Sequence, residues 1–395
     1  MKKRYRITAL LLSVALMACA CGNTAEEEKE PVSQESQQEA ENVPEEKEYQ
    51  GKLDEIVPMA YSNAEGLNLE PGTYISIIGK GSENDFWKEV KKGVEQAAED
   101  INATLGYEGN DKVKVTFSSP EEADNVDEQV SILDEELARY PIALGISIAD
   151  VQACEVQFDI ALENSIPIVA FDSGSSYEGI QAMISTDNEA AGALAASRMA
   201  DLMDESGDVL VFVHESDSEA ALARKKAFEK EIKNKYEEIS IVKTVSWDDL
   251  DDLKEELMNE VHNGTYTLES SEELTEEMIS QEILVDYILT KYPDVKGCYA
   301  TNSMTTQLFA EGLERMEMHD AVVIGYDAGG DQMQALRDGK IDGLIVQNPF
   351  GMGYAAVIAC ARAGLSIGNE AFVNTGYTWV DKENMETEEV QKLLY

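Results

Sequence analysis

Carboxylate and amide side chains stand directly after several apolar runs of this 395-residue sequence. Each run has the length and the β-branched content of a buried strand. In an open α/β sheet, ligands bind beyond the carboxyl ends of the strands, so side chains placed there can meet at one site. The polar residues that this rule selects are Lys80, Ser82, Asn84, Asp172, Ser173, Glu215, Ser216, Asn302, Ser303 and Asp327.

Helix N-caps and turns are the more common role of such residue types. We assign Ser216 and Ser303 to this structural role. Asp172 and Asp327 differ, because they follow two related segments, "SIPIVAFDSG" (165–174) and "HDAVVIGYDAG" (319–329). A carboxylate repeated at matching strand ends indicates a functional position in both halves of the chain.

Two aromatic residues, Phe86 and Trp87, stand side by side where a helix begins. Adjacent helical residues point about 100° apart, so the two rings cannot face the same core. One ring can enter the core while the other stands over a cleft, although Trp87 can also be a purely structural cap. Trp247, at the end of another predicted strand, is a similar candidate. Carboxylates, amides and flat aromatic rings together are suited to binding a sugar.

Nine short apolar runs alternate with amphipathic stretches of helical period from residue 72 onward. This alternation predicts parallel sheets covered by helices on both faces. The internal repeat predicts two doubly wound lobes of similar plan, with a polar insertion at 262–282 in the second. The predicted strands are 73–79, 112–117, 142–147, 166–171, 208–213, 239–245, 296–301, 321–326 and 342–347.

The N-terminus carries an export signal, predicted over residues 1–18. A basic start precedes an apolar segment, 7–17, that is too short to span a bilayer. The following "LMAC" resembles a bacterial lipobox, which predicts acylation of Cys19. Cys21 is the other possible acceptor, and an ordinary cleaved signal with a chance cysteine is the alternative.

An acidic segment follows, with ten Glu and two Lys between Glu26 and Glu48. Such a composition cannot offset the entropy of ordering the chain, so we predict a disordered tether over 19–70. The formal net charge of −47 argues against nucleic acid and against a basic patch for anionic lipid. The acyl chains are then the membrane anchor.

Metal binding and nucleophilic catalysis are disfavoured by the few His and Cys residues. The three His are scattered, and Cys154, Cys298 and Cys360 each lie inside an apolar segment, as small buried hydrophobes do. We therefore predict no metal and no cofactor. Nucleotide binding is also disfavoured, because "GKGS" lacks the spacing of a phosphate-binding loop.

From residue 72 to the end, the chain resembles the type I periplasmic sugar-binding proteins of ABC transporters, the ribose-binding group. The motifs that carry the resemblance are "KGSENDFWKEVKKG", "IPIVAFDSG", "STDNEAAG", "ATNS", "VVIGYDAGG" and "LRDGKIDGLIVQNPFGMGY". It implies a periplasmic binding protein type I fold, with two α/β lobes joined by a three-stranded hinge near 186, 347 and 378. The first lobe would comprise 71–186 and 348–378, and the second 187–347 and 379–395.

The resemblance also implies ligand contacts. Phe86 and Trp87 match aromatic residues that sandwich the sugar, while Asp187 and Asn188 match a hinge pair. Departures occur at Ser173 and Lys80, where ribose-binding members have Arg and commonly Ser, and at Arg224, which lies two residues after their second Arg position. Ribose itself is therefore not expected. Asn84, Asp172, Asn302, Asp327 and Gln347 match polar ligand contacts of the family. With the residues chosen from the strand ends and the aromatic positions, the predicted ligand-binding set is Lys80, Asn84, Phe86, Trp87, Asp172, Ser173, Arg224, Trp247, Asn302, Asp327 and Gln347.

These observations predict a monomeric, extracytoplasmic lipoprotein of a Gram-positive-type cell surface. It would capture a monosaccharide and deliver it to an ABC permease, without catalysis. A binding protein that serves a sensor kinase or chemoreceptor is the alternative. A glycoside-active enzyme is a further one, in which Asp172 and Asp327 would act as acid and base.

Overall fold

The computed structural model describes residues 47–267 and 275–395. The predicted signal peptide, both candidate lipidation cysteines (Cys19 and Cys21) and the tether up to residue 46 lie outside these residues, as does part of the 262–282 insertion. Among the described residues, no helix combines the length and the hydrophobicity needed to cross a membrane.

The first lobe is built on a six-stranded sheet in the order β11-β5-β4-β3-β1-β2. All its neighbouring strands pair in parallel. Its strands are β1 (Tyr74–Ile78), β2 (Lys114–Ser118), β3 (Leu144–Ile146), β4 (Ile168–Phe171), β5 (Ile180–Ser185) and β11 (Phe372–Asn374). Its helices include α2 (Asp85–Leu105), α3 (Val126–Leu137), α4 (Val151–Glu163) and α11 (Pro349–Gly364), with a short 3₁₀ turn, η2 (Gly109–Asp111).

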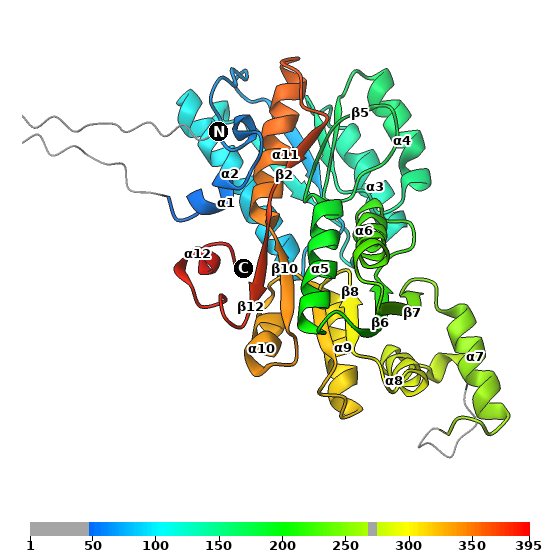
Figure 1. The fold of residues 1–395 in the computed structure, drawn as a ribbon. Coiled ribbons are helices and arrows are strands. Elements are labelled where there is room, and N and C mark those ends of the chain that lie inside the picture. Colours follow the sequence, from blue (N-terminus) through cyan, green and yellow to red (C-terminus); the bar gives the residue numbers. More distant parts are fainter. Residues whose placement is uncertain (1–46, 268–274) are drawn as a thin grey trace, which may run out of the picture. The chain divides into compact units, whose positions relative to one another are not determined.

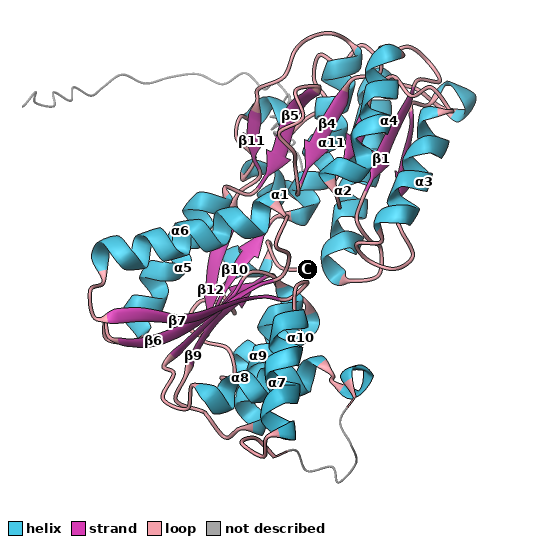
Figure 2. Cartoon of the chain, turned by 90° about the vertical axis from the view of Figure 1, so that its right-hand side faces the viewer, coloured by secondary structure: helices cyan, strands magenta, loops and turns pink. Residues whose placement is uncertain are grey.

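The second lobe repeats this plan in the order β12-β10-β9-β8-β6-β7 (Figures 1 and 2). Its strands are β6 (Gly207–Val213), β7 (Ile239–Ser246), β8 (Gly297–Ala300), β9 (Val322–Tyr326), β10 (Gly343–Gln347) and β12 (Tyr377–Asp381). Its helices are α5 (Asn188–Leu202), α6 (Glu219–Lys235), α7 (Asp251–His262), α8 (Gln281–Lys291), α9 (Ser303–Arg315), α10 (Gly330–Asp338) and α12 (Glu388–Gln391), with a 3₁₀ turn, η3 (Glu276–Met278).

The predicted fold class is confirmed, and all nine predicted strands are present. The sequence reading missed β5, β11 and β12, which are edge or next-to-edge strands with less continuous apolar patterns. β12 pairs antiparallel with β10, so the second sheet is not purely parallel. The chain passes between the sheets three times, at 186–187, at Asn348 and at 375–376. Residues 377–378, predicted in the first lobe, belong to the second sheet through β12.

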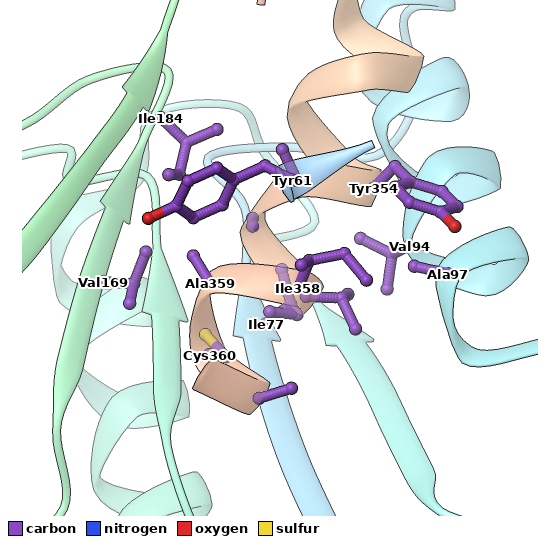
Figure 3. Packing of buried hydrophobic residues seen from close by; sticks show 14 of the residues in the cluster. Tyr61, Ile77, Val94, Ala97, Val169, Ile184, Tyr354, Ile358, Ala359 and Cys360 are labelled. Carbon is purple, nitrogen blue, oxygen red and sulfur yellow. The ribbon is translucent and has the colours of Figure 1, made fainter. Parts of the chain in front are cut away.

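Residues 47–70 correct the prediction of a tether that reaches residue 70. This segment forms α1 (Gln50–Asp54) and a 3₁₀ turn, η1 (Met59–Tyr61), and it buries Leu53, Ile56 and Tyr61 in the core of the first lobe. Figure 3 shows the Tyr61 ring among Ile184, Val169 and Ala359. The acidic composition that predicts disorder ends near residue 48, and the apolar residues beyond it bury enough surface to stay folded.

Helices α2 and α11 pack against each other closely enough for their backbones to touch (Figure 1). A Cβ atom on Gly93 would lie 2.0 Å from the carbonyl oxygen of Phe350, and one on Gly353 would lie 2.0 Å from that of Val90. Only glycine fits at these two positions. The helix contact holds α11, which follows the second chain crossing, firmly on the first lobe.

The three described cysteines are buried and free, as predicted for small hydrophobes. Burial raises the pKa of the Cys154 thiol to about 11 and that of Cys298 to about 12. Neither thiol is therefore ionised at neutral pH, and both behave as core side chains.

Candidate ligand-binding cleft

A cavity of about 100 Å³ lies where the carboxyl ends of strands from both lobes meet. Nine of the eleven predicted ligand-binding residues line it, namely Lys80, Asn84, Phe86, Trp87, Asp172, Arg224, Asn302, Asp327 and Gln347. Ala123, Asp124, His214, Glu215 and Ser303 complete the lining. Residues at the strand ends of both lobes therefore meet at one cleft, as expected for ligand-binding residues of parallel sheets.

Asp172 and Asp327 occupy equivalent positions in the two lobes. Each directly follows a strand, β4 or β9, and each has left-handed backbone, with φ of 56° and 75°. The Asp172 N–H donates to the carbonyl of Ile184, and the Asp327 N–H donates to that of Ile345, both at 2.9 Å. Non-glycine residues rarely adopt this conformation, and strain of this kind is characteristic of functional sites.

The two carboxylates differ in their hydrogen bonds. Asp172 Oδ2 accepts from the hydroxyl of Ser147 at 2.9 Å. Asp327 Oδ1 accepts from Gln347 Nε2 at 2.8 Å and from the hydroxyl of Tyr395 at 3.1 Å. Burial raises the pKa of Asp327, although Arg224, Gln347 and Tyr395 oppose this shift. Both of these hydrogen bonds are accepted by Asp327 Oδ1, so Oδ2 can receive a ligand hydroxyl.

Lys80 places a positive charge across the cleft. Its Nζ lies 3.2 Å from Glu215 of the second lobe and 3.3 Å from Asp124 of the first. Burial disfavours the ammonium, but the carboxylates of Glu215, Asp124 and Asp172 outweigh it and raise the pKa of Lys80. Lys80 therefore stays charged and links the two lobes electrostatically.

Arg224 and Gln347 belong to a hydrogen-bonded network at the chain crossings. The guanidinium of Arg224 donates to Asn188 Oδ1 (2.7 Å), to the Thr301 carbonyl (2.7 Å) and to Gln347 Oε1 (2.5 Å). Gln347 Oε1 also accepts from the hydroxyl of Thr186 at 3.1 Å. This network ties the first crossing to the second, so these two cleft residues serve the hinge as well as the cavity.

His214 follows β6 and borders the cleft. Its backbone N–H and its Nδ1 both contact the hydroxyl of Thr301, at 3.0 Å and 2.7 Å. Burial, together with the charges of Arg224 and Lys80, holds its pKa well below the ordinary value for histidine. The imidazole is therefore neutral, and it adds a hydrogen-bonding group but no charge to the cleft.

One ring of the aromatic pair enters the core, as the sequence analysis predicted. Trp87 is 6 % exposed and packs in the core of the first lobe with its ring against Phe171, while Phe86 is only partly buried. The two rings are perpendicular, with centroids 5.2 Å apart. Both residues line the cavity, and Phe86 is the less buried of the two. The carboxamide oxygens of Asn84 and Asn302 cap α2 and α9, which leaves their NH₂ groups for a ligand.

Two predicted residues lie outside the cleft. Trp247 is 4 % exposed and packs against Phe212 in the core of the second lobe, so the prediction that it lines the cleft is wrong. It follows β7, the edge strand farthest from the hinge in the sheet order. Ser173 is buried, contacts the hydroxyl of Ser218 across the lobes at 3.1 Å, and lines a neighbouring cavity.

Three residues near the cleft were missed by the sequence analysis. His214 directly follows β6, so the strand-end rule could have selected it. Asp124 lies in the loop after β2, lines the cavity and contacts Lys80 there. Tyr395 comes from the end of the sequence, where no strand or motif marks it. Among the described residues, no cluster of three His, Cys, Asp or Glu side chains could hold a metal ion.

A family model described as a periplasmic binding protein domain matches residues 75–365, which is most of the chain. The protein belongs to the periplasmic binding protein family. The matched region spans both lobes and includes all the strand-end residues of the cleft. The paired six-stranded sheets and the triple crossing are the type I form of this fold.

Solved structures of similar fold support this assignment. A carbohydrate transporter solute-binding protein from Agrobacterium radiobacter, in complex with D-arabinose, is 24% identical, with a TM-score of 0.66, over 82% of this chain and 99% of that one. An ABC transporter solute-binding protein from Agrobacterium vitis with bound D-fucose is 23% identical (TM-score 0.65; 82% and 100% covered). A glucose-galactose binding protein from Geobacillus stearothermophilus is 22% identical (TM-score 0.65; 80% and 99% covered). At these identities the likeness establishes the fold.

Proposed function

We propose that this protein binds a monosaccharide in the cleft between its two lobes and delivers it to an ABC permease. The observation that carries the proposal is the pair of equivalent carboxylates, Asp172 and Asp327, which face the cleft from matching strand ends. Carboxylates accept pairs of hydroxyl hydrogen bonds, and sugars supply such hydroxyls. The sugars named in the similar solved structures support the same class of ligand.

Each side of the cleft has a distinct part in binding. The ring of Phe86 offers a flat apolar surface to the C–H face of a sugar. Asp172 binds hydroxyl groups from the first lobe, while Asp327 and the NH₂ group of Asn302 bind them from the second. A ligand held by both lobes favours the closed arrangement, because it interacts with both sets of groups only when the lobes are together.

The hinge network gives closure a defined axis. Arg224 joins Asn188, directly after the first crossing, to Gln347, directly before the second. The Asn348 amide of the second crossing donates to the Thr375 carbonyl of the third at 2.9 Å. All three crossings are thereby linked, so the lobes turn about one connected set of residues. An affinity on the order of micromolar, about −8 kcal/mol, is expected for a ligand that must also be released to a permease.

Export and anchoring are part of the proposal. The signal over 1–18, the acylated Cys19 (or Cys21) and the acidic tether up to residue 46 would hold a monomeric domain outside the cell membrane. Mass spectrometry of the protein made in a bacterial host would detect a diacylglycerol on the mature N-terminal cysteine. An unmodified N-terminus would contradict the lipid anchor but not the sugar site.

A thermal-shift screen tests the sugar site directly. The described domain (residues 47–395) is heated with single pentoses, hexoses, disaccharides, inositols and amino acids. A ligand at 100 times its Kd adds about 2.7 kcal/mol of stability, which raises the Tm by several degrees. We expect one monosaccharide to give this shift and calorimetry to confirm its Kd.

Two cleft variants and one control give the screen its specificity. Asp327→Asn and Phe86→Ala should abolish the shift. Asp320→Asn should retain it, because Asp320 is exposed and precedes β9 at the end opposite to Asp327. A shift that persists in both cleft variants would place the ligand elsewhere. No shift with any sugar, but one with an amino acid, would replace the proposed ligand class.

A further inference from the structure

Tyr395 lines two cavities at once. One, of about 240 Å³, is the outer part of the cleft and shares Asn84, Phe86, Ser303 and Asp327 with the inner cavity. The other, of about 540 Å³, lies against the first lobe and the C-terminal segment. The inner cavity alone, at about 100 Å³, is smaller than the roughly 300 Å³ at which ligand pockets begin. A sugar ring must therefore extend into the outer part, where Tyr395 stands.

The tyrosine is held in place by contacts with both lobes. Its hydroxyl donates to Asp327 Oδ1 at 3.1 Å, and its ring lies edge-on to Phe86 with centroids 6.5 Å apart. Burial raises the pKa of the Tyr395 phenol well above the ordinary value, so it remains a neutral donor. Figure 2 marks the end of the chain, C, between α10 of the second lobe and the helices of the first.

The segment that carries Tyr395 is anchored to the second lobe. Met385 and Val390 are buried in its core, and Gln391 Nε2 donates to the Met385 carbonyl at 2.7 Å. Arg337 on α10 pairs with Glu386 at 3.2 Å. The ring of Tyr395 is thus presented to the cleft by a packed element, which gives it a defined position.

The larger cavity has features that suit a second sugar ring. Tyr49 and Phe350 form an aromatic surface, with centroids 5.3 Å apart, and Lys52 Nζ lies 5.7 Å from the Phe350 ring. Lys52 and Lys92, which also line this cavity, both form ion pairs with the carboxylate of Glu89. Aromatic surfaces bordered by charged hydrogen-bonding groups bind carbohydrate rings well. Among the residues that the structure describes, Tyr395 alone lines both this cavity and the cleft.

We propose that Tyr395 is a specificity-determining residue that limits the ligand to a single sugar ring. Its ring closes the outer cleft toward the larger cavity, and its hydroxyl holds the ring there through Asp327. Without the ring, the cleft opens onto the Tyr49–Phe350 surface and admits a disaccharide. The inference rests on the proposed sugar-binding function of the same cleft.

Calorimetric titration of the described domain tests the size limit. The probes are D-galactose with melibiose and D-glucose with cellobiose, together with D-arabinose and D-fucose. For the wild type, we expect a monosaccharide to bind at least about 100-fold more tightly than a disaccharide, a difference of roughly 2.7 kcal/mol. Tyr395→Ala should reduce this ratio at least about 10-fold. Tyr395→Phe should keep it, because the ring remains against Phe86.

Two further chains complete the experiment. Leu393→Ala, in the same segment but lining neither cavity, should keep the wild-type ratio. A chain that ends at Leu394 removes the same ring by another route and should behave as Tyr395→Ala does, and melting curves verify that each variant is folded. An unchanged ratio in both ring-less chains, with monosaccharide binding intact, would overturn this inference alone. Absence of binding of any sugar by the folded wild type would overturn the proposed function and this inference with it.

Discussion

Replacement of Lys80 tests the electrostatics of the cleft. The Lys80 side chain is 8% exposed and pairs with Glu215 across the lobes at 3.2 Å. Lys80→Met keeps an apolar stem but removes the charge, so the closed cleft holds Glu215 without its cation. Removal of one partner of a buried pair costs about 3 to 5 kcal/mol. Because the Glu215 side chain retains 22% exposure, we take the lower end, about 3 kcal/mol.

This cost opposes closure of the lobes more than it opposes folding, because an open cleft returns Glu215 to water. Ligand affinity includes the free energy of closure, so Lys80→Met should weaken binding about 100-fold at neutral pH. Calorimetry with the sugar found in the screen measures the loss. Lys88→Met is the control, because Lys88 is 54% exposed and its pair with Asp85 contributes little.

The loss should depend on pH. Burial, with the charges of Asp124 and Asp172, already raises the pKa of Glu215, although Lys80 opposes this. Without Lys80, the pKa of Glu215 in the closed form rises further above its value in the open form. The penalty is therefore complete above this raised pKa, and affinity recovers as the pH falls through it. The wild type should gain less affinity in this way, because Lys80 opposes the rise in the pKa of Glu215.

Two results would refute this reasoning. One is wild-type affinity of Lys80→Met at neutral pH, which would mean that the buried pair does not control closure. The other is a lost affinity that stays constant between about pH 5 and 8. The double variant Lys80→Met with Glu215→Gln should recover most of the affinity, since the neutral amide carries no unpaired charge.

Three other predictions concern the fold around the cleft. Gly353→Ala should lower the free energy of unfolding by about 1 to 3 kcal/mol, because a Cβ would meet the Val90 carbonyl. Calorimetric melting should show a lower Tm, by roughly 2 to 4 °C per kcal/mol, and an unchanged Tm would contradict the close helix contact. Trp247→Ala should lower the free energy of unfolding by about 3 to 5 kcal/mol by leaving a core cavity, and the Kd for sugar should stay unchanged. A weaker Kd without a lower Tm would show that Trp247 contributes to ligand binding. Deletion of residues 47–70 should expose the core beneath Tyr61 and yield unstable protein, whereas deletion of residues 1–46 should leave the Tm unchanged; equal melting of the two truncated chains would contradict the packing of this segment.

The lobe plan and much of the cleft could be predicted because they depend on local patterns. Alternating apolar strands and amphipathic helices specify a parallel α/β sheet, and the carboxyl ends of its strands lie at one edge. Asp172 and Asp327 directly follow their strands, and Lys80 and Asn302 stand two residues after theirs, so sequence position alone was sufficient to place them. The equivalence of the two lobes could be predicted because each contains an apolar strand followed by an aromatic residue and Asp, which is Asp172 in one lobe and Asp327 in the other.

The tertiary structure decided which residues depart from those patterns. Trp247 also follows a strand, but β7 lies at the far edge of its sheet, and strand order is a long-range property that no local pattern encodes. The Lys80–Glu215 pair joins residues 135 positions apart, and Tyr395 reaches Asp327 from 68 positions away. Residues 47–70 bury Leu53, Ile56 and Tyr61 in the core of the first lobe, together with residues far along the chain. Contacts of this kind depend on how distant segments pack, so composition and spacing determine the elements, and packing determines the neighbours of each side chain.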